Sequence, residues 1–196
     1  MIPAGDRRHG WGGSPAEPDL YHRSGGGILL RIFVDADACP VKDEIYRVAA
    51  RYGLEVTLVA ASWMRKPDDA WIDLKVVGGG IDVADDWIVE HVGAGDIVVT
   101  ADIPLAARCL GRGATVIGSA GRPFTDDNIG SALATRGLLA ELRDLGEASG
   151  GPPPFEKRDR SRFLQQLDES IHAIRRRAAS LEAPSFPQPA PDTNDR

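Results

Sequence analysis

The chain has very few cysteines. Only two occur in 196 residues, Cys39 and Cys109, and neither belongs to a CxxC pair. Thiolate zinc sites need closely spaced cysteine pairs, and disulfide frameworks need several cysteines. The cysteine content therefore argues against a thiolate zinc site and against a disulfide scaffold.

Long apolar runs are also missing. The longest hydrophobic stretches have the length of a strand, whereas a membrane-spanning helix needs about 20 apolar residues. Glycine, proline and charged residues dominate the first residues, where a secretory signal would have an apolar core. We expect a soluble cytoplasmic protein with no membrane partner, and the sequence leaves its oligomeric state open.

The composition predicts one folded domain between two tails. Residues 1–27 show no helical or strand periodicity, so a disordered N-terminal extension is expected there. Residues 28–178 alternate apolar strands with amphipathic helices and form the predicted domain. Residues 179–196 are rich in proline, and we expect a disordered tail.

The charge is unevenly distributed. Residues 28–150 contain 12 Lys and Arg against 19 Asp and Glu, whereas residues 151–178 contain 7 against 4. Phosphate contacts supply most non-specific affinity for nucleic acid, so the acidic body is a poor non-specific binder. It is suited to attracting cations, while the last helix is basic.

The stretch from Ile28 to Pro40 organises the chain. The apolar run 28–34 is typical of a strand buried on both faces, and Asp35 and Asp37 follow it directly. Pro40 is typical of the first turn of a helix. In an open parallel sheet, ligands bind beyond the carboxyl ends of the strands, so these aspartates occupy a functional position.

The same alternation continues along the chain and predicts an α/β fold with a doubly wound, mostly parallel sheet. We expect further strands over residues 54–61, 74–77, 97–100 and 113–118. Helices are expected over 40–52, 82–92, 103–110, 126–145 and 155–179. The predicted buried positions of the last two helices are Ile129, Leu133, Leu138, Leu142 and Leu145, then Leu164, Leu167, Ile171 and Ile174.

Further carboxylates follow later strands. Asp82, Asp85 and Asp86 have the i, i+3, i+4 spacing of one side of a helical first turn, and Asp102 follows the fourth strand. Each could simply cap a helix. Their convergence with Asp35 and Asp37 instead favours a site for Mg²⁺ or Mn²⁺, which prefer oxygen ligands.

Other polar residues are candidate substrate contacts. Thr100, at the end of the fourth strand, could hydrogen-bond to a neighbouring carboxylate or to a metal-bound water. Lys157, Arg158 and Arg160 begin the basic helix and offer partners to phosphate. The alternative is a solvated helix packed on the body. The loop 62–69, with Trp63 and two cations, is either a substrate-contacting loop or an ordinary surface loop.

With these residues in hand, the chain resembles the bacterial YaiI/YqxD family of uncharacterised proteins. The matching segments are FVDADACPVK (33–42), GGGIDVADDWIV (78–89), GDIVVTADIPLA (95–106), RPFTDDNI (122–129) and GPPPFEKRDRSRFLQQLD (151–168). The resemblance implies a PIN-like α/β fold, which metal-dependent ribonucleases use, and no established activity.

The PIN pattern has an aspartate after the first strand, acids on a middle helix and Thr-x-Asp after the fourth strand. By resemblance, Asp35, Asp85 or Asp86, and Thr100 with Asp102 match it here. The sequence departs from the pattern at Asp35-Ala36-Asp37, where one aspartate is usual, and leaves open which of the two binds metal.

Three functions are compatible with these residues. The first is a Mg²⁺- or Mn²⁺-dependent nuclease that acts on RNA, or alternatively on DNA, through Asp35, Asp85 or Asp86, and Asp102. The second is a non-catalytic module that binds RNA, a nucleotide or a protein. The third is a haloacid-dehalogenase-type phosphatase with Asp35 as nucleophile and Asp37 as general acid, which lacks a suitable lysine in residues 76–150.

Overall fold

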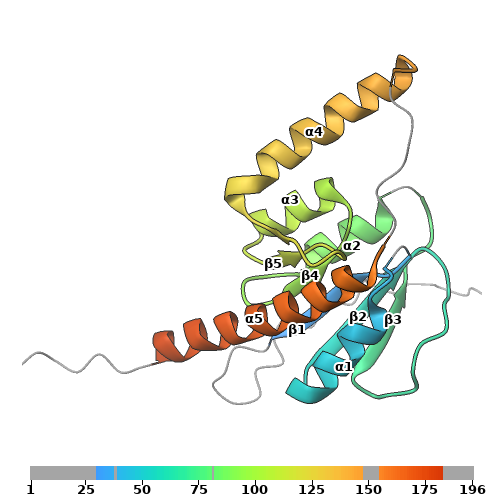
Figure 1. The fold of residues 1–196 in the computed structure, drawn as a ribbon. Helices are drawn as coiled ribbons and strands as arrows, with labels where there is room; N and C mark the ends of the chain where they lie inside the picture. Colours follow the sequence, from blue (N-terminus) through green and yellow to red (C-terminus); the bar gives the residue numbers. More distant parts are fainter. Residues whose placement is uncertain (1–29, 38, 81, 148–154, 183–196) are drawn as a thin grey trace, which may run out of the picture.

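The protein is built on one six-stranded sheet, seen in a computed structural model that describes residues 30–37, 39–80, 82–147 and 155–182 (Figure 1). The strand order is β3-β2-β1-β4-β5-β6. The strands are β1 (Arg31–Asp35), β2 (Glu55–Ala60), β3 (Ile72–Val76), β4 (Ile97–Val99), β5 (Thr115–Ile117) and β6 (Pro123–Phe124). β1 to β5 are parallel and β6 is antiparallel, which confirms the predicted doubly wound, mostly parallel arrangement.

The helices are α1 (Lys42–Tyr52), α2 (Val83–His91), α3 (Ile103–Gly111), α4 (Asp126–Asp144) and α5 (Lys157–Glu182). α5 continues to Glu182, so the first residues of the expected tail are helical. The expected extension 1–27 and the rest of the tail lie outside the described residues.

Two helices cover each face of the sheet. α1 and α5 pack on one face in a cluster with Ile32 and Val34, and α2 and α3 pack on the other with Phe33. β1 therefore has a core on both faces, which explains its unbroken apolar run. The predicted Leu167, Ile171 and Ile174 are buried in α5, while Phe163 takes the buried place expected for the partly exposed Leu164.

The predicted buried face of α4 is wrong. None of its residues is fully buried, and Leu133, Leu138 and Leu145, which follows the helix, are exposed. Of the predicted positions, Ile129 is partly buried and packs against the core. Because α1, α5, α2 and α3 already cover the sheet, the rest of α4 has no core face left to cover. It contacts α3 and extends away from the body (Figure 1).

Two segments of the sheet differ from the expected boundaries. β3 begins two residues earlier than expected, at Ile72, and β6 was not expected at all. β6 is only two residues long and pairs antiparallel with β5, so it leaves no strand-length pattern in the sequence.

The strand order places a switch point between β1 and β4. From β1 the chain runs through α1 to β2 and β3, and α2 then returns it to β4 on the other side of β1. Connections that leave in opposite directions open a crevice at the carboxyl ends of these two strands.

Candidate functional site

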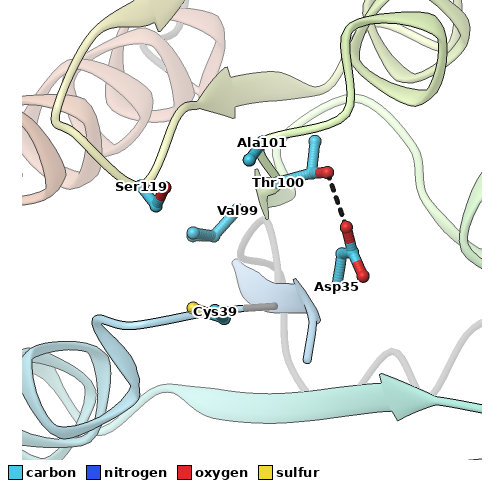
Figure 2. Close-up of a pocket in the computed structure, with 6 residues that line it drawn as sticks. All are labelled: Asp35, Cys39, Val99, Thr100, Ala101 and Ser119. Atoms are coloured by element: carbon cyan, nitrogen blue, oxygen red, sulfur yellow. Dashed lines mark hydrogen bonds between the residues drawn. The ribbon is translucent and has the colours of Figure 1, made fainter. Parts of the chain in front are cut away.

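Asp35 and Thr100 meet at this switch point. Val34 pairs with Val99 in the parallel register of β1 and β4, so the next residue of each strand reaches the carboxyl edge together. The Thr100 hydroxyl donates a 2.9 Å hydrogen bond to Asp35 Oδ2, as Figure 2 shows. Thr100 is buried, and its hydroxyl oxygen accepts a second hydrogen bond from the Asp102 amide at 3.0 Å. Thr100 thus links the two predicted aspartates.

Asp102 caps α3 and also faces α4. Its Oδ1 accepts a 2.9 Å hydrogen bond from the Leu105 amide, which confirms the predicted N-cap. Its Oδ2 lies 3.6 Å from Nη2 of Arg136 on α4. One carboxylate oxygen of Asp102 therefore caps α3, and the other faces Arg136 on the neighbouring helix α4.

Asp85 is within electrostatic reach of both aspartates. Burial, followed by the negative charges of Asp102, Asp35 and Asp82, raises the pKa of Asp85 to about 6. Burial also raises the pKa of Asp35, against the hydrogen bond from Thr100. The carboxylates of Asp35, Asp85 and Asp102 therefore repel one another across the crevice, as ligands of a cation would.

The other three predicted metal ligands have different surroundings. Asp86 forms an ion pair with Arg108 of α3, so it separates from Asp85 although the two are adjacent in sequence. Asp37 Oδ2 accepts a 2.9 Å hydrogen bond from the Ala61 amide at the end of β2. Asp82 precedes α2 with a φ of 67°, in the left-handed region, and makes no side-chain cap.

The described carboxylates of this edge are too far apart to enclose a metal ion by themselves. Among the described residues, no three His, Cys, Asp or Glu side chains are grouped closely enough to enclose a metal ion. Mg²⁺ does not need such a cage, because it commonly binds one or two carboxylates and keeps several waters. Asp35 and Asp102, joined through Thr100, are the carboxylates best placed for that mode.

A small cavity lies beside the Asp35–Thr100 hydrogen bond (Figure 2). It measures about 10 Å³ and is lined by Cys39, Ser119 and residues of the two strand ends. Burial raises the pKa of Cys39 to about 11 and that of Cys109 to about 12. Both thiols are protonated near neutral pH, so neither is a ready nucleophile.

The predicted phosphate contacts on α5 differ in their availability. Arg160 Nη1 binds both carboxylate oxygens of the buried Glu44 on α1, at 2.8 and 3.0 Å. Arg158 pairs with Glu156 on the surface, and Lys157 is exposed. Contact of these residues with phosphate stays a prediction, and the structure gives Arg160 a partner within the fold.

Three basic side chains near the carboxyl edge of the sheet were not predicted from the sequence. Lys42 Nζ donates a 2.8 Å hydrogen bond to the Ala36 carbonyl, Arg108 holds Asp86, and Arg136 faces Asp102. Lys42 belongs to the same short motif as Asp35, which was a usable signal. Arg108 and Arg136 have no such signal, because only the packing of α3 against α2 and α4 brings them close.

Fold and site together define a doubly wound α/β domain with carboxylates gathered at its switch point. The chain belongs to the YaiI/YqxD family of uncharacterised bacterial proteins, whose profile, described as "Uncharacterized BCR, YaiI/YqxD family", matches residues 33–173. This confirms the resemblance seen in the motifs. The likeness to PIN domains stays a prediction, and no solved structure matches the chain.

Close relatives carry only a family label. A UPF0178 protein of Nitrobacter winogradskyi is 55% identical over 153 residues, covering 78% of this chain and 98% of the relative. A second, from Rhodopseudomonas palustris, is 56% identical over 152 residues, covering 78% and 96%. A third, from Bradyrhizobium sp. strain ORS 278, is 54% identical over 157 residues, covering 80% and 96%. These names state no activity. Within the described residues, no helix is both long and apolar enough to cross a bilayer.

Proposed function

We propose that the protein is a divalent-metal-dependent nuclease that hydrolyses phosphodiester bonds, with RNA as its substrate and the cytoplasm as its location. One observation carries the proposal. Thr100 links Asp35 to the Asp102 backbone at the switch point, and Asp85 is close enough for its pKa to respond to both carboxylates. Such an acidic edge serves cation-assisted phosphate chemistry.

Asp35 and Asp102 would hold the cation, Mg²⁺ or Mn²⁺. Bound there, the cation would neutralise phosphate charge and lower the pKa of a coordinated water. The Thr100 hydroxyl fixes the rotamer of Asp35, and the α3 cap fixes that of Asp102. Both carboxylates are therefore oriented before substrate arrives.

Asp85 would act as the proton acceptor. Burial is the main cause of its raised pKa and makes its carboxylate more basic than an ordinary aspartate, whereas a cation held by Asp35 and Asp102 would offset the part that their charges contribute. As water attacks phosphorus, the new P–O bond forms, the bond to the leaving oxygen breaks, and the proton of the attacking water passes to Asp85. The leaving oxygen takes its proton from solvent.

Exposed cations at the start of α5 would contact the substrate backbone. The contact of Arg160 with Glu44, near the start of α1, places the beginning of α5 at the carboxyl edge of the sheet. Lys157 and Arg158 lie in the same turn of α5 and face solvent. Exposed Trp63, in the loop after β2, follows another strand end at this edge.

A second candidate function is a non-catalytic module that binds RNA, a nucleotide or a protein. The observation that favours it is the spacing of the acids, since no three candidate ligands among the described residues form one compact group. Retained binding without turnover would be its signature. The phosphatase alternative gains nothing, because Asp37, its proposed general acid, is engaged by the Ala61 amide.

Cleavage of labelled single-stranded RNA tests the proposal. Wild type, Asp35→Asn, Asp85→Asn and Asp102→Asn are incubated with Mg²⁺, with Mn²⁺ or with EDTA. We expect cleavage that needs the metal and falls at least 100-fold in each variant, whereas Asp86→Asn, the neighbouring control, retains most of it. Metal-independent cleavage, or cleavage unaffected in all three variants, contradicts the proposal. Fluoroberyllate should leave the activity unchanged, because no aspartyl-phosphate forms.

A further inference from the structure

A second hollow lies next to the carboxylate site. It is a groove of about 610 Å³ between one face of α4, the strand β6 and the start of α3. Its lining includes Arg122, Phe124, Asn128, Thr135, Arg136 and Arg143. The α4 residues among them follow helical spacing, so they form one continuous side of the groove.

This groove is a positive strip on an acidic protein. Among the described residues that line it, three are arginines and none carries a carboxylate, although α4 itself contains Asp126, Asp127, Glu141 and Asp144. Arginine stays protonated at all ordinary pH values and suits phosphate oxygens in particular. The acidic side chains of α4 therefore lie on faces of the helix other than the one that lines the groove.

The spacing of the arginines favours a long anion over a small one. Arg136 and Arg143 are seven residues apart on α4, which separates them by about 10 Å along the helix axis. One phosphate cannot contact both comfortably, so the two side chains suit successive phosphates of a chain. The Phe124 ring offers an apolar surface on which a base can stack.

The groove opens at the candidate catalytic residues. Ala101 and Ile103, the neighbours of Asp102 in sequence, belong to its lining. Arg136 Nη2 lies 3.6 Å from Asp102 Oδ2, so this arginine borders both the groove and the site. A chain lying in the groove would therefore lead a phosphodiester to the carboxylates.

We propose that the α4–β6 groove is the binding channel for single-stranded nucleic acid, with Arg122, Arg136 and Arg143 on its phosphates and Phe124 against a base. The proposal deepens the proposed function and rests on it for the direction of the strand toward Asp102. It gives a role to α4, which has no fully buried residue: one face of this helix forms a wall of the channel.

Binding is measured separately from cleavage. Fluorescence anisotropy with a labelled 12-nucleotide single-stranded RNA is recorded in EDTA over a range of salt concentrations, for wild type and for the double variant Arg136→Gln/Arg143→Gln. Arg112→Gln is the matched control, since Arg112 is an exposed arginine at the opposite end of α3. All three positions are exposed, so folding should be retained, and circular dichroism with thermal melting verifies it.

We expect the double variant to bind at least tenfold more weakly. Its slope of log affinity against log salt should be smaller by about 1.4, because two phosphate contacts are lost at about 0.7 each for a single strand. Arg112→Gln should match wild type within twofold. Equal affinity and slope in wild type and the folded double variant, or no RNA binding by wild type, overturns the channel.

The outcomes separate this proposal from the function above. Wild-type binding that depends on Arg136 and Arg143, without cleavage in any metal, supports the channel and overturns the nuclease. Metal-dependent cleavage that is unchanged in the double variant, with unchanged binding, overturns the channel and leaves the nuclease standing.

Discussion

The Thr100 hydroxyl and the Asp35 carboxylate, 65 residues apart in sequence, are joined by a 2.9 Å hydrogen bond across the switch point of the sheet. The bond depends on the pairing of β1 with β4, so the fold itself creates it. The Asp102 amide donates to the same hydroxyl, which ties the start of α3 to the end of β1. Thr100 therefore fixes the position of Asp35 relative to the start of α3, where Asp102 lies.

Replacing Thr100 tests this linking role. Thr100→Val removes the donor to Asp35 and the acceptor for the Asp102 amide, and we expect it to unfold about 1–3 kcal/mol more easily, since buried partners lose their hydrogen bonds. Its Mn²⁺ affinity should fall at least fivefold. Thr100→Ser keeps the hydroxyl and should remain within twofold of wild type. Urea unfolding and calorimetric titration measure both effects, and equal Mn²⁺ affinity in the valine variant would refute the link.

We expect Asp85 to make the stability of the protein depend on pH. Its folded pKa of about 6 lies above the value of an unfolded aspartate, so between about pH 4 and 6 the folded state binds more protons than the unfolded state. The free energy of unfolding should therefore fall as pH rises through this window. Asp85→Asn removes this penalty, so we expect it to be more stable than wild type at pH 7 and equal to it near pH 4.

Urea unfolding at pH 4, 5, 6 and 7 measures that difference. Asp86→Asn is the control, because it removes an ion pair with Arg108 rather than a repulsion, and it should gain no stability at pH 7. A stability difference between wild type and Asp85→Asn that is constant over the four pH values would show that Asp85 is not strained by its neighbours.

Two arginines of α5 are expected to have different roles: Arg160 stabilises the fold, and Arg158 contacts the substrate. Arg160→Gln leaves the buried carboxylate of Glu44 without its cation, and we expect a loss of about 2 kcal/mol, discounted from a fully buried pair because Arg160 is partly exposed. Arg158→Gln removes only a surface pair, so its stability should change by less than about 1 kcal/mol. If α5 contacts the substrate backbone, Arg158→Gln should still weaken RNA binding. Thermal unfolding and anisotropy measure the two effects, and unchanged stability of Arg160→Gln would contradict its structural role.

Gly121 marks the closest approach of the β5–β6 turn to α5. Its φ is +75°, and an added Cβ would lie 2.4 Å from the Phe163 backbone nitrogen. Gly121→Ala should therefore destabilise the fold by about 3 kcal/mol or more, because neither backbone can move aside easily.

Gly137→Ala is the matched control on exposed α4. Nothing lies within 4 Å of an added Cβ there, so this variant should instead be more stable than wild type by about 0.5–1 kcal/mol. Equal denaturation midpoints for the two variants would be the contrary result.

Much of this architecture could be predicted from the sequence, because it follows from local patterns. The apolar run before Asp35 and the alternation of strands and helices after it predict a parallel sheet, and parallel strands bring their carboxyl ends to one edge. This arrangement by itself predicts that Asp35 and Asp102 lie at the same edge of the sheet. The apolar stripe of α5 was equally readable, since Leu167, Ile171 and Ile174 follow one helical face.

The features that could not be predicted from the sequence depend on packing between distant segments. Asp85 and Asp86 look equivalent in sequence, and only Arg108 on the neighbouring helix separates them. The exposure of α4 could not be read from its leucines, because it results from both sheet faces being covered by other helices. The groove arginines come from the β5–β6 turn and two turns of α4, with no shared motif.

Calorimetric titration of Mn²⁺ into wild type and into Asp102→Asn decides whether Asp102 is a metal ligand. We expect wild type to bind Mn²⁺ at the switch point and Asp102→Asn to bind at least tenfold more weakly while remaining folded. Equal affinity in the two proteins, or no binding by wild type, would show that the site holds no cation through Asp102 and would leave this residue only the role of capping α3.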